Sequence, residues 1–351
     1  MEFRGKIFSI YSFYIAEEIN LALAQNLLNA SKRVDFRRSK STPKRLKYET
    51  SPLTVNLEMP FDFDIIDDFY PSNANLKIFD FGAVSISLLW NGKTEFVNLK
   101  DISSDLFDSD LEERVCSYVS GLKSSLNKTL KKPFEELIYE DYIVFQTDDV
   151  EIEPSLFLKK NKEILGHILR MEKSNLSQME IEEATQIVHS YYEFDMVIID
   201  YNASFVVDTD YEDILEIIEF SQVELAQIRA LDRMLDKNLD YFESILEKRS
   251  VFLPPIRGIS LFFLNVSLNR ERLDNALKLI GDLYLARIYR SLGLKLHVSD
   301  WENSLERNLK TLSEIYQLLR EDFFQKIANF LEITIILLIL IEIILGLLRF
   351  L

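Results

Sequence analysis

The chain has 351 residues, of which 48% are hydrophobic, and a formal net charge of −17 at pH 7. This acidity argues against a general nucleic-acid binder, and the scarcity of glycine (9) and proline (8) argues against a disordered chain. Cys116 is the single cysteine, which excludes an intramolecular disulfide and a cysteine-rich metal site.

The first 207 residues alternate between strand and helix patterns and predict an α+β domain with a hairpin-containing sheet. Residues 6–15 are apolar on both faces, as in a buried strand, and residues 17–30 predict a helix. Alternation over 53–59, ended by Pro60, predicts a half-buried strand.

The clearest β signal lies between residues 76 and 99. Strands are predicted over 76–81 and 83–90, with Gly82 between them as a bulge or close-approach site. Asn91-Gly92 predicts a type I′ hairpin turn into a strand over 94–99. The remaining predicted elements are a helix over 105–123, strands over 142–145, 196–200 and 205–207, and helices over 159–170 and 177–191.

From residue 208 the apolar residues recur at helical spacing, which predicts a helical domain and stalk over 208–329. A capping box at Thr209-x-x-Glu212 predicts the start of a helix that ends before Pro254. A second helix is expected over 270–292, ending at Gly293. Ser299-x-x-Glu302 predicts the cap of a third helix.

The third helix carries one apolar stripe that continues toward the C-terminus. Its members are Leu305, Leu309, Leu312, Tyr316, Leu319 and Phe323, followed by Phe330, Ile333, Leu337, Leu340 and Ile344. This spacing predicts one helix of about fifty residues, about 75 Å long. Leu312 and Leu319 lie in a part of the stripe that we expect to drive self-association, although packing on the helix over 214–246 is the open alternative.

Residues 330–351 form the predicted membrane anchor. The run from Phe330 to Leu348 is apolar apart from Glu332, Thr334, Glu342 and Gly346. As a helix it spans about 29 Å, which matches a hydrocarbon core of about 30 Å. We therefore expect a single-pass, tail-anchored membrane protein with the bulk of the chain on the cytoplasmic side, or on the matrix side of a mitochondrion if the host is eukaryotic.

Two acids and one glycine mark the predicted anchor. Glu342 lies near its centre, so we expect its carboxyl to donate a hydrogen bond between helices of a homo-oligomer, with Gly346 allowing close backbone approach. Glu332 lies nearer to the headgroups, where it is hydrated. Pairing of Glu342 with Arg349 and an ion or proton path are the alternatives.

Two segments resemble a known family. Phe79 to Asn91 resembles an aromatic–glycine–valine–tryptophan strand, and Phe330 to Ile343 resembles a tail with two spaced glutamates and paired isoleucines. Both are similar to the "required for meiotic nuclear division" proteins, which include the fungal Sad-interacting factors. The resemblance covers residues 76–100 and 208–348. It implies one C-terminal transmembrane helix, homo-oligomerisation and, as in mitochondrial members, support of translation at the inner membrane, with no catalytic residues assigned.

The chain departs from that family at three places. No N-terminal transit peptide is visible, position 333 is Ile where the family often has Trp, and the region 101–195 is long and divergent. These differences favour a bacterial or archaeal relative over a mitochondrial one.

A basic stretch interrupts the acidic chain between residues 32 and 47. It contains one acidic side chain, Asp35, and eight basic ones. The basic side chains are Lys32, Arg33, Arg37, Arg38, Lys40, Lys44, Arg45 and Lys47. Such a stretch is either a solvated loop or a contact for anionic lipid headgroups or for ribosomal RNA.

Motifs for catalysis are sparse. His167, His189 and His297 stand apart and lack zinc-type spacing, so no metal site and no cofactor are expected. We predict a non-catalytic membrane scaffold that tethers partners, with no small-molecule substrate. The alternative is a membrane-bound, metal-dependent enzyme whose carboxylates, Asp62, Asp64, Asp67 and Asp68 with Asp200 and Asp208, converge on one cleft.

Overall fold

In this computed structural model, the described residues are 1–28, 50–57, 62–66, 68–148, 153–247, 264, 268 and 282–350. The chain divides into two compact units, one formed by residues 1–230 with 269–301 and the other by residues 231–268 with 302–351. The predicted boundary at residues 207 and 208 falls within the first unit.

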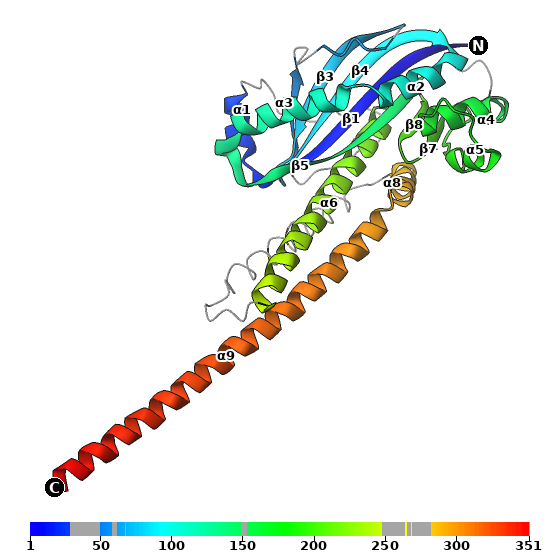
Figure 1. Cartoon of the computed structure of the whole chain (residues 1–351). Coiled ribbons are helices and arrows are strands. Elements are labelled where there is room, and N and C mark those ends of the chain that lie inside the picture. The colour runs from blue at the N-terminus through cyan, green and yellow to red at the C-terminus, as the bar shows by residue number, and fades with distance from the viewer. Residues whose placement is uncertain are drawn as a thin grey trace. The chain divides into compact units, whose positions relative to one another are not determined.

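The first unit is organised around one mixed sheet of eight strands in the order β2-β3-β4-β1-β5-β8-β7-β6 (Figure 1). The strands are β1 (Glu2–Ile19), β2 (Leu53–Leu57), β3 (Phe69–Ile78), β4 (Ala83–Glu95), β5 (Leu130–Thr147), β6 (Ile187–His189), β7 (Met196–Ile199) and β8 (Ala203–Val207). Pairing is parallel between β5 and β8 and antiparallel between the other neighbours. The predicted α+β class is therefore confirmed.

The described helices are α1 (Leu21–Leu27), α2 (Leu99–Phe107), α3 (Leu111–Ser125), α4 (Pro154–Arg170), α5 (Gln178–Ala184), α6 (Glu212–Glu247), α8 (Leu283–Lys295) and α9 (Val298–Phe350). The two longest described helices are α6 and α9, with 36 and 53 residues. Short 3₁₀ turns, η1 (Phe96–Asn98) and η2 (Asn127–Thr129), precede α2 and β5.

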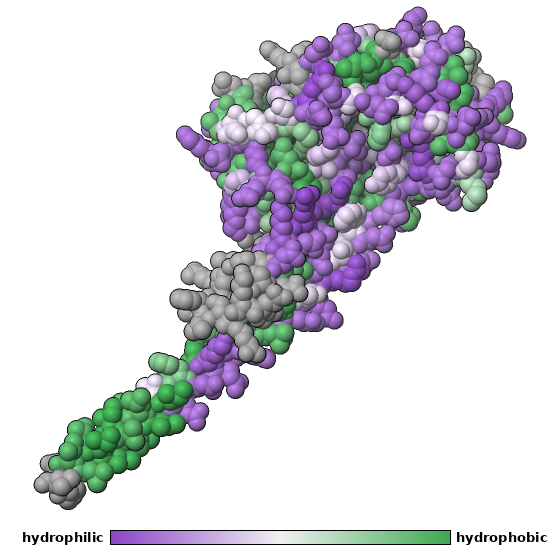
Figure 2. All heavy atoms as spheres, viewed as in Figure 1, coloured by the Kyte–Doolittle hydropathy of each residue, from purple (hydrophilic) through white to green (hydrophobic). Residues whose placement is uncertain are grey.

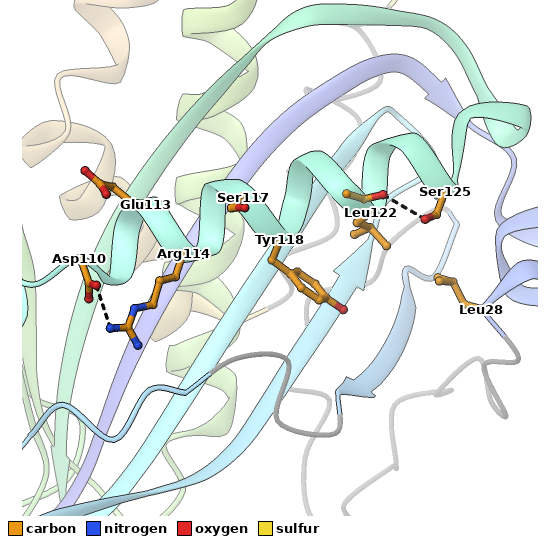
Figure 3. A pocket seen from close by; sticks show the side chains of 9 residues that line it. Leu28, Asp110, Glu113, Arg114, Ser117, Tyr118, Leu122 and Ser125 are labelled. Carbon is orange, nitrogen blue, oxygen red and sulfur yellow. Dashed lines mark hydrogen bonds and ion pairs between the residues drawn. The ribbon is translucent and has the colours of Figure 1, made fainter.

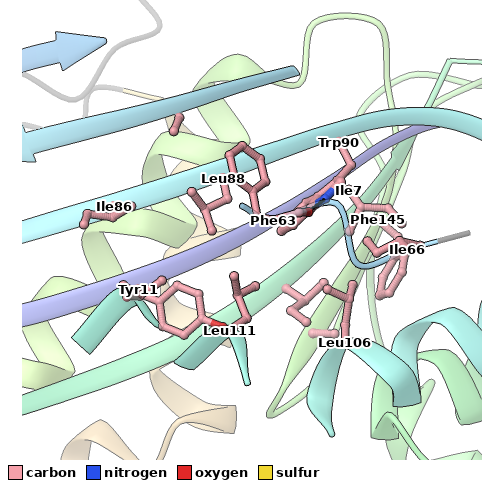
Figure 4. Close-up of a cluster of buried hydrophobic side chains, with 14 of the residues drawn as sticks. Ile7, Tyr11, Phe63, Ile66, Ile86, Leu88, Trp90, Leu106, Leu111 and Phe145 are labelled. Carbon is pink, nitrogen blue, oxygen red and sulfur yellow. Dashed lines mark hydrogen bonds between the residues drawn. The ribbon is translucent and has the colours of Figure 1, made fainter. Parts of the chain in front are cut away.

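The main core lies between the sheet and helices α2, α3 and α4. Figure 4 shows Ile7, Tyr11, Leu88 and other sheet side chains facing Leu106 and Leu111 of α2 and α3. The Trp90 indole is fully buried and donates a hydrogen bond of 2.7 Å to the Phe63 carbonyl. Because β1 lies between β4 and β5 and is apolar on both faces, its predicted burial is confirmed.

The opposite face of the sheet is covered by the first half of α6. Lys77 on β3 pairs with Glu219 at 2.5 Å and with Glu216 at 3.8 Å, and Glu140 on β5 pairs with Arg229. Charged side chains therefore tie both halves of the sheet to one helix.

The predicted hairpin turn at Asn91-Gly92 is wrong, because β4 runs through both residues. Gly92 pairs with Gly5 on one side and with Phe69 on the other. A Cβ on Gly92 would lie 2.4 Å from the Asp68 carbonyl oxygen, so this glycine allows close packing and not a turn. The turn between β3 and β4 lies instead at Phe79 to Gly82. The strand predicted over 76–81 corresponds to β3, which begins earlier, at Phe69, and ends earlier, at Ile78.

Several predicted helices have different limits in the structure. The helix expected from Glu17 is wrong in its first residues, because β1 continues to Ile19 and α1 begins at Leu21 after the Asn20 cap. The helix expected over 105–123 is two helices, α2 and α3. The helix expected over 177–191 ends at Ala184 and is followed by β6.

Two predicted helix starts and one predicted helix end are also wrong. Helix α6 begins at Glu212, three residues after Thr209. Helix α8 continues through Gly293 to Lys295, and α9 begins at Val298, so Ser299 lies inside it. His297, at a left-handed φ of 53°, separates α8 from α9. A capping signal is worth only about 1 kcal/mol, so it does not fix a helix end by itself.

In the second unit, α9 packs against the later part of α6. Leu305, Leu312 and Leu319 are buried within the single chain. The Asn308 amide donates hydrogen bonds to Asp232 at 3.1 Å and to Asp236 at 2.9 Å. The predicted helix of about fifty residues is confirmed, and of its two possible partners the structure shows packing within one chain.

Candidate functional site

The C-terminal part of α9 is the described segment most unlike a soluble protein surface. It is the one described helix long and apolar enough to cross a membrane, and its most apolar stretch is not buried. Its large apolar side chains, from Phe330 to Leu348, are 43% to 69% exposed, and Figure 2 shows them as a continuous apolar surface. Contiguous exposed apolar surface of this extent marks a membrane or protein contact.

The three residues singled out in the predicted anchor all lie on this exposed helix. Glu332 and Glu342 are exposed, and a Cβ on Gly346 would meet no atom within 4 Å. Leu312 and Leu319 differ from these three, because both are buried inside the second unit. The stripe predicted for self-association is therefore already covered in the isolated chain.

The predicted polyanion contact over residues 32–47 lies outside the described residues. Its eight basic side chains therefore stay a sequence prediction. Leu28, the last described residue before the stretch, is half-buried beside the sheet core.

The carboxylates of the alternative, enzymatic hypothesis lie in three separate places. Asp62 accepts a hydrogen bond from the Asp64 amide, and Asp68 accepts one from the Thr94 hydroxyl. Asp200 is enclosed beside α4 and α8, whereas Asp208 lines a small cavity at the start of α6. Asp67 is outside the described residues. Among those described, no three His, Cys, Asp or Glu side chains are placed to hold a metal ion.

Asp200 is the centre of a buried ion cluster. Its carboxylate is fully buried, lies 3.0 Å from Lys295 Nζ and lies 3.3 Å from Arg170 Nε. Burial raises the pKa of Asp200, and the Lys295 and Arg170 charges oppose that rise. Lys295 also donates to the Glu183 carbonyl at 2.9 Å. Because the cluster joins α4, α5, β7 and α8 and is closed to solvent, it holds these elements together and offers no site for a substrate.

Two further hollows lie on the first unit. A groove of about 800 Å³ follows the outer face of α3, and Figure 3 shows Tyr118 and the Asp110–Arg114 pair along it. A second cavity of about 480 Å³ lies at the end of β1, β4 and β5, where Arg4, Lys6 and Lys93 surround it. Lys6 is already engaged there, because it donates to the Tyr211 hydroxyl at 2.9 Å.

The three histidines lie in separate surroundings. His167 Nδ1 contacts the Glu172 carbonyl at 2.8 Å, His189 Nε2 contacts the Ser291 hydroxyl at 2.7 Å, and His297 Nδ1 contacts Asp300 at 3.2 Å. Burial lowers the pKa of His189, and the nearby Arg287 lowers it further. Each ring has a structural partner, and the structure does not bring the three together.

One grouping was missed from the sequence. Tyr191, Tyr192 and Asp195 meet Asp208 and Asp282 around the small cavity at the start of α6. The density of tyrosine and aspartate between residues 191 and 213 is a local signal for it. The contribution of Asp282 has no sequence signal, because it depends on where α8 begins.

Comparison with known proteins gives a family without an assigned activity. Residues 4–213 match the family described as "Uncharacterized protein MJ0711, N-terminal domain". The uncharacterised protein MJ0711 of Methanocaldococcus jannaschii is 28% identical over 266 residues, which cover 72% of this chain and 75% of that protein. No solved structure matches the chain.

Proposed function

The chain belongs to the family of the uncharacterised protein MJ0711, and on this premise we propose that it is a non-catalytic scaffold anchored in a membrane by residues 330–348. The observation that carries this proposal is the exposed apolar surface of α9. Transferring fifteen Leu, Ile and Phe side chains into lipid outweighs the insertion of two glutamates, which costs about 2.5 to 3.5 kcal/mol each at the bilayer centre.

The proposed scaffold holds the α+β unit at the membrane surface, on the cytoplasmic side. The dispersed positions of Asp62, Asp68, Asp200 and Asp208 support a non-catalytic role over the enzymatic alternative. Self-association and the tethering of partners, including support of translation, are proposed from the resemblance to the "required for meiotic nuclear division" proteins. Because Leu312 and Leu319 are already buried within one chain, the proposed contact between copies lies in the membrane segment.

Membrane attachment is tested by fractionation and carbonate washing. Truncation after Asn329 is expected to move the protein into the soluble fraction, and so is the full-length double variant Ile336→Lys with Ile339→Lys. Leu318→Lys is the matched control, because Leu318 is 58% exposed on the same helix but precedes the proposed span. Retention of both altered proteins in washed membranes would overturn the anchor.

The basic stretch over 32–47 extends the proposal to a contact with a polyanion. Anionic lipid headgroups, or ribosomal RNA, are the proposed polyanions, and the contact weakens with salt because the Debye length is about 8 Å at physiological ionic strength. Reversing the charge of Arg37, Arg38, Lys44 and Arg45 is expected to abolish co-sedimentation with anionic vesicles or with ribosomes. Equal sedimentation of the wild type and the variant in both assays would leave the stretch without this role.

A further inference from the structure

A basic cavity lies at the end of β1, β4 and β5, next to the N-terminus (Figure 1). Its volume of about 480 Å³ falls within the range of about 300 to 1,000 Å³ that is usual for small-molecule sites. The charged side chains among its described lining residues are Arg4, Lys6, Lys93 and Asp148. The wall therefore has a positive balance, although the whole chain has a net charge of −17.

The strand register brings the three basic side chains to one face of the sheet. Arg4 on β1 is directly opposite Lys93 on β4, and Lys6 is two residues further along β1. Since alternate residues of a strand share a face, the three side chains are neighbours. Like charges directly opposite each other on adjacent strands are destabilising. This arrangement therefore lowers stability unless an anion lies between the side chains.

Each of these basic side chains has hydrogen-bonding capacity left. Arg4 is exposed, and its guanidinium has no hydrogen-bond or ion-pair partner within the described part of the chain. Lys6 donates one hydrogen bond, to the Tyr211 hydroxyl at 2.9 Å, which leaves two of its three N–H groups. Lys93 lies 3.7 Å from Glu2, and these side chains are 67% and 63% exposed. Water screens such an exposed pair, so an anion can displace it.

Helix α6 leaves this end of the sheet uncovered. Tyr211, which immediately precedes α6, contacts Lys6 and packs on Phe8 with the ring centroids 5.7 Å apart. Because α6 starts only after this contact, Arg4 and Lys93 at the end of the strands are exposed. A ligand can therefore reach both side chains from solvent.

An exposed tyrosine continues the wall on the same face. Tyr70 on β3 is opposite Asn91 on β4, and Asn91 is opposite Lys6 on β1. With neighbouring strands about 4.8 Å apart, the backbones of Tyr70 and Lys6 are about 10 Å apart. Tyr70 lines the cavity and is 63% exposed. An exposed aromatic ring beside a basic site offers a surface on which a nucleotide base can stack.

We propose that this cavity binds a nucleoside monophosphate. Arg4 and Lys93 hold the phosphate group, to which the planar guanidinium donates two parallel N–H hydrogen bonds, and Lys6 supplies a further donor. The Tyr70 ring carries the base. The acidity of the rest of the chain disfavours a longer polyanion. The proposal concerns binding alone and is independent of the membrane anchor.

The test measures binding of AMP to the full-length protein in detergent by calorimetry, at constant ionic strength. The wild type is expected to bind saturably. Arg4→Gln is expected to bind about tenfold more weakly, because hydrogen bonds from a charged group are lost. Tyr70→Ala is expected to weaken AMP binding by about tenfold as well, and to leave the binding of inorganic phosphate unchanged. Lys128→Gln is the matched control, because Lys128 is exposed and does not line the cavity.

Thermal unfolding separates a binding role of Arg4 from a structural one. Because Arg4→Gln removes like-charge repulsion, it should unfold at the same temperature as the wild type or higher, and should lose the stabilisation that AMP gives to the wild type. A wild type without saturable AMP binding would overturn the proposal. Equal AMP affinity of the wild type and Arg4→Gln would also overturn it, because the nucleotide would then bind elsewhere. Equal affinity of the wild type for AMP and for inorganic phosphate would overturn the role of Tyr70.

Discussion

At the residue scale, single glycines decide how closely the backbone segments of the first unit approach one another. Gly82 has φ of +95°, and its carbonyl accepts from the Ile15 and Ala16 amides at 3.0 and 3.3 Å. A Cβ on Gly82 would lie 1.8 Å from the Ala16 carbonyl oxygen. The expectation of a close-approach site at Gly82 is confirmed, and the turn between β3 and β4 depends on it.

We predict that Gly82→Ala lowers the free energy of unfolding by about 2 to 4 kcal/mol, because left-handed backbone strain and a backbone clash act together. The measurement is denaturant unfolding in detergent, followed by tryptophan fluorescence, to which the buried Trp90 contributes. Gly121→Ala is the matched control, because a Cβ there meets nothing within 4 Å and α3 gains an alanine. We expect that control to raise stability by up to about 1 kcal/mol. Equal stability of the two variants would contradict the role of Gly82.

Glu140 makes stability depend on pH. It is 8% exposed on β5, and burial raises its pKa from 4.5 to about 7 although Arg229 opposes the rise. A carboxyl whose pKa is raised in the folded state contributes stability below pH 4.5 and loses that contribution as pH rises through about 7. As the pH rises from 4.5 to 8, the free energy of unfolding of the wild type should therefore fall by about 2 to 3 kcal/mol relative to that of Glu140→Gln. Exposed Glu135 on the same strand provides the control Glu135→Gln, which should follow the wild type.

At the element scale, the position of each helix follows from what it packs against. α6 presents Glu216 and Glu219 to Lys77 in the first unit and Asp232 and Asp236 to Asn308 in the second. The apolar stripe of α9 is covered by the same chain at Leu312 and Leu319. Periodicity identifies such a stripe but carries no information on which surface will cover it.

We predict that Leu312→Asp with Leu319→Asp unfolds the helix pair of the second unit without changing the oligomeric mass. Burying two carboxylates in an apolar contact costs several kcal/mol. Light scattering measures the mass in detergent, and circular dichroism during thermal unfolding measures the helix pair. Leu318→Asp is the control, since Leu318 is exposed on the same turn. A smaller mass with unchanged unfolding would show that the stripe joins copies of the chain.

At the scale of the whole molecule, the proposed anchor places one of its two acids near the centre of the span. Glu342 lies about three residues, or about 5 Å, from the centre of the apolar segment. There a carboxyl is costly unless it is hydrogen-bonded, which is why we expect it to join helices of neighbouring copies.

We predict that Glu342→Leu weakens self-association of the membrane segment by about 1 to 2 kcal/mol, whereas Glu342→Gln, which keeps a donor and an acceptor, preserves it. A two-hybrid assay in membranes measures the association. Glu332→Leu is the control, because that acid lies nearer to the headgroups and should have little effect. Unchanged association of Glu342→Leu would show that the acid makes no contact between helices.

The sequence alone determined the features that depend on neighbouring residues. The buried strand β1, strands β7 and β8, the long helix α9 and its apolar segment were predicted because burial patterns and hydrophobic length are local properties. The tertiary structure decided what depends on distant partners. Asn91 and Gly92 stay in a strand because β1 and β3 pair with them from both sides. Asp200 meets Lys295 and Arg170, and Tyr284 lies beside Asp195, only because the sheet and α8 bring together residues that are about 30 to 95 positions apart.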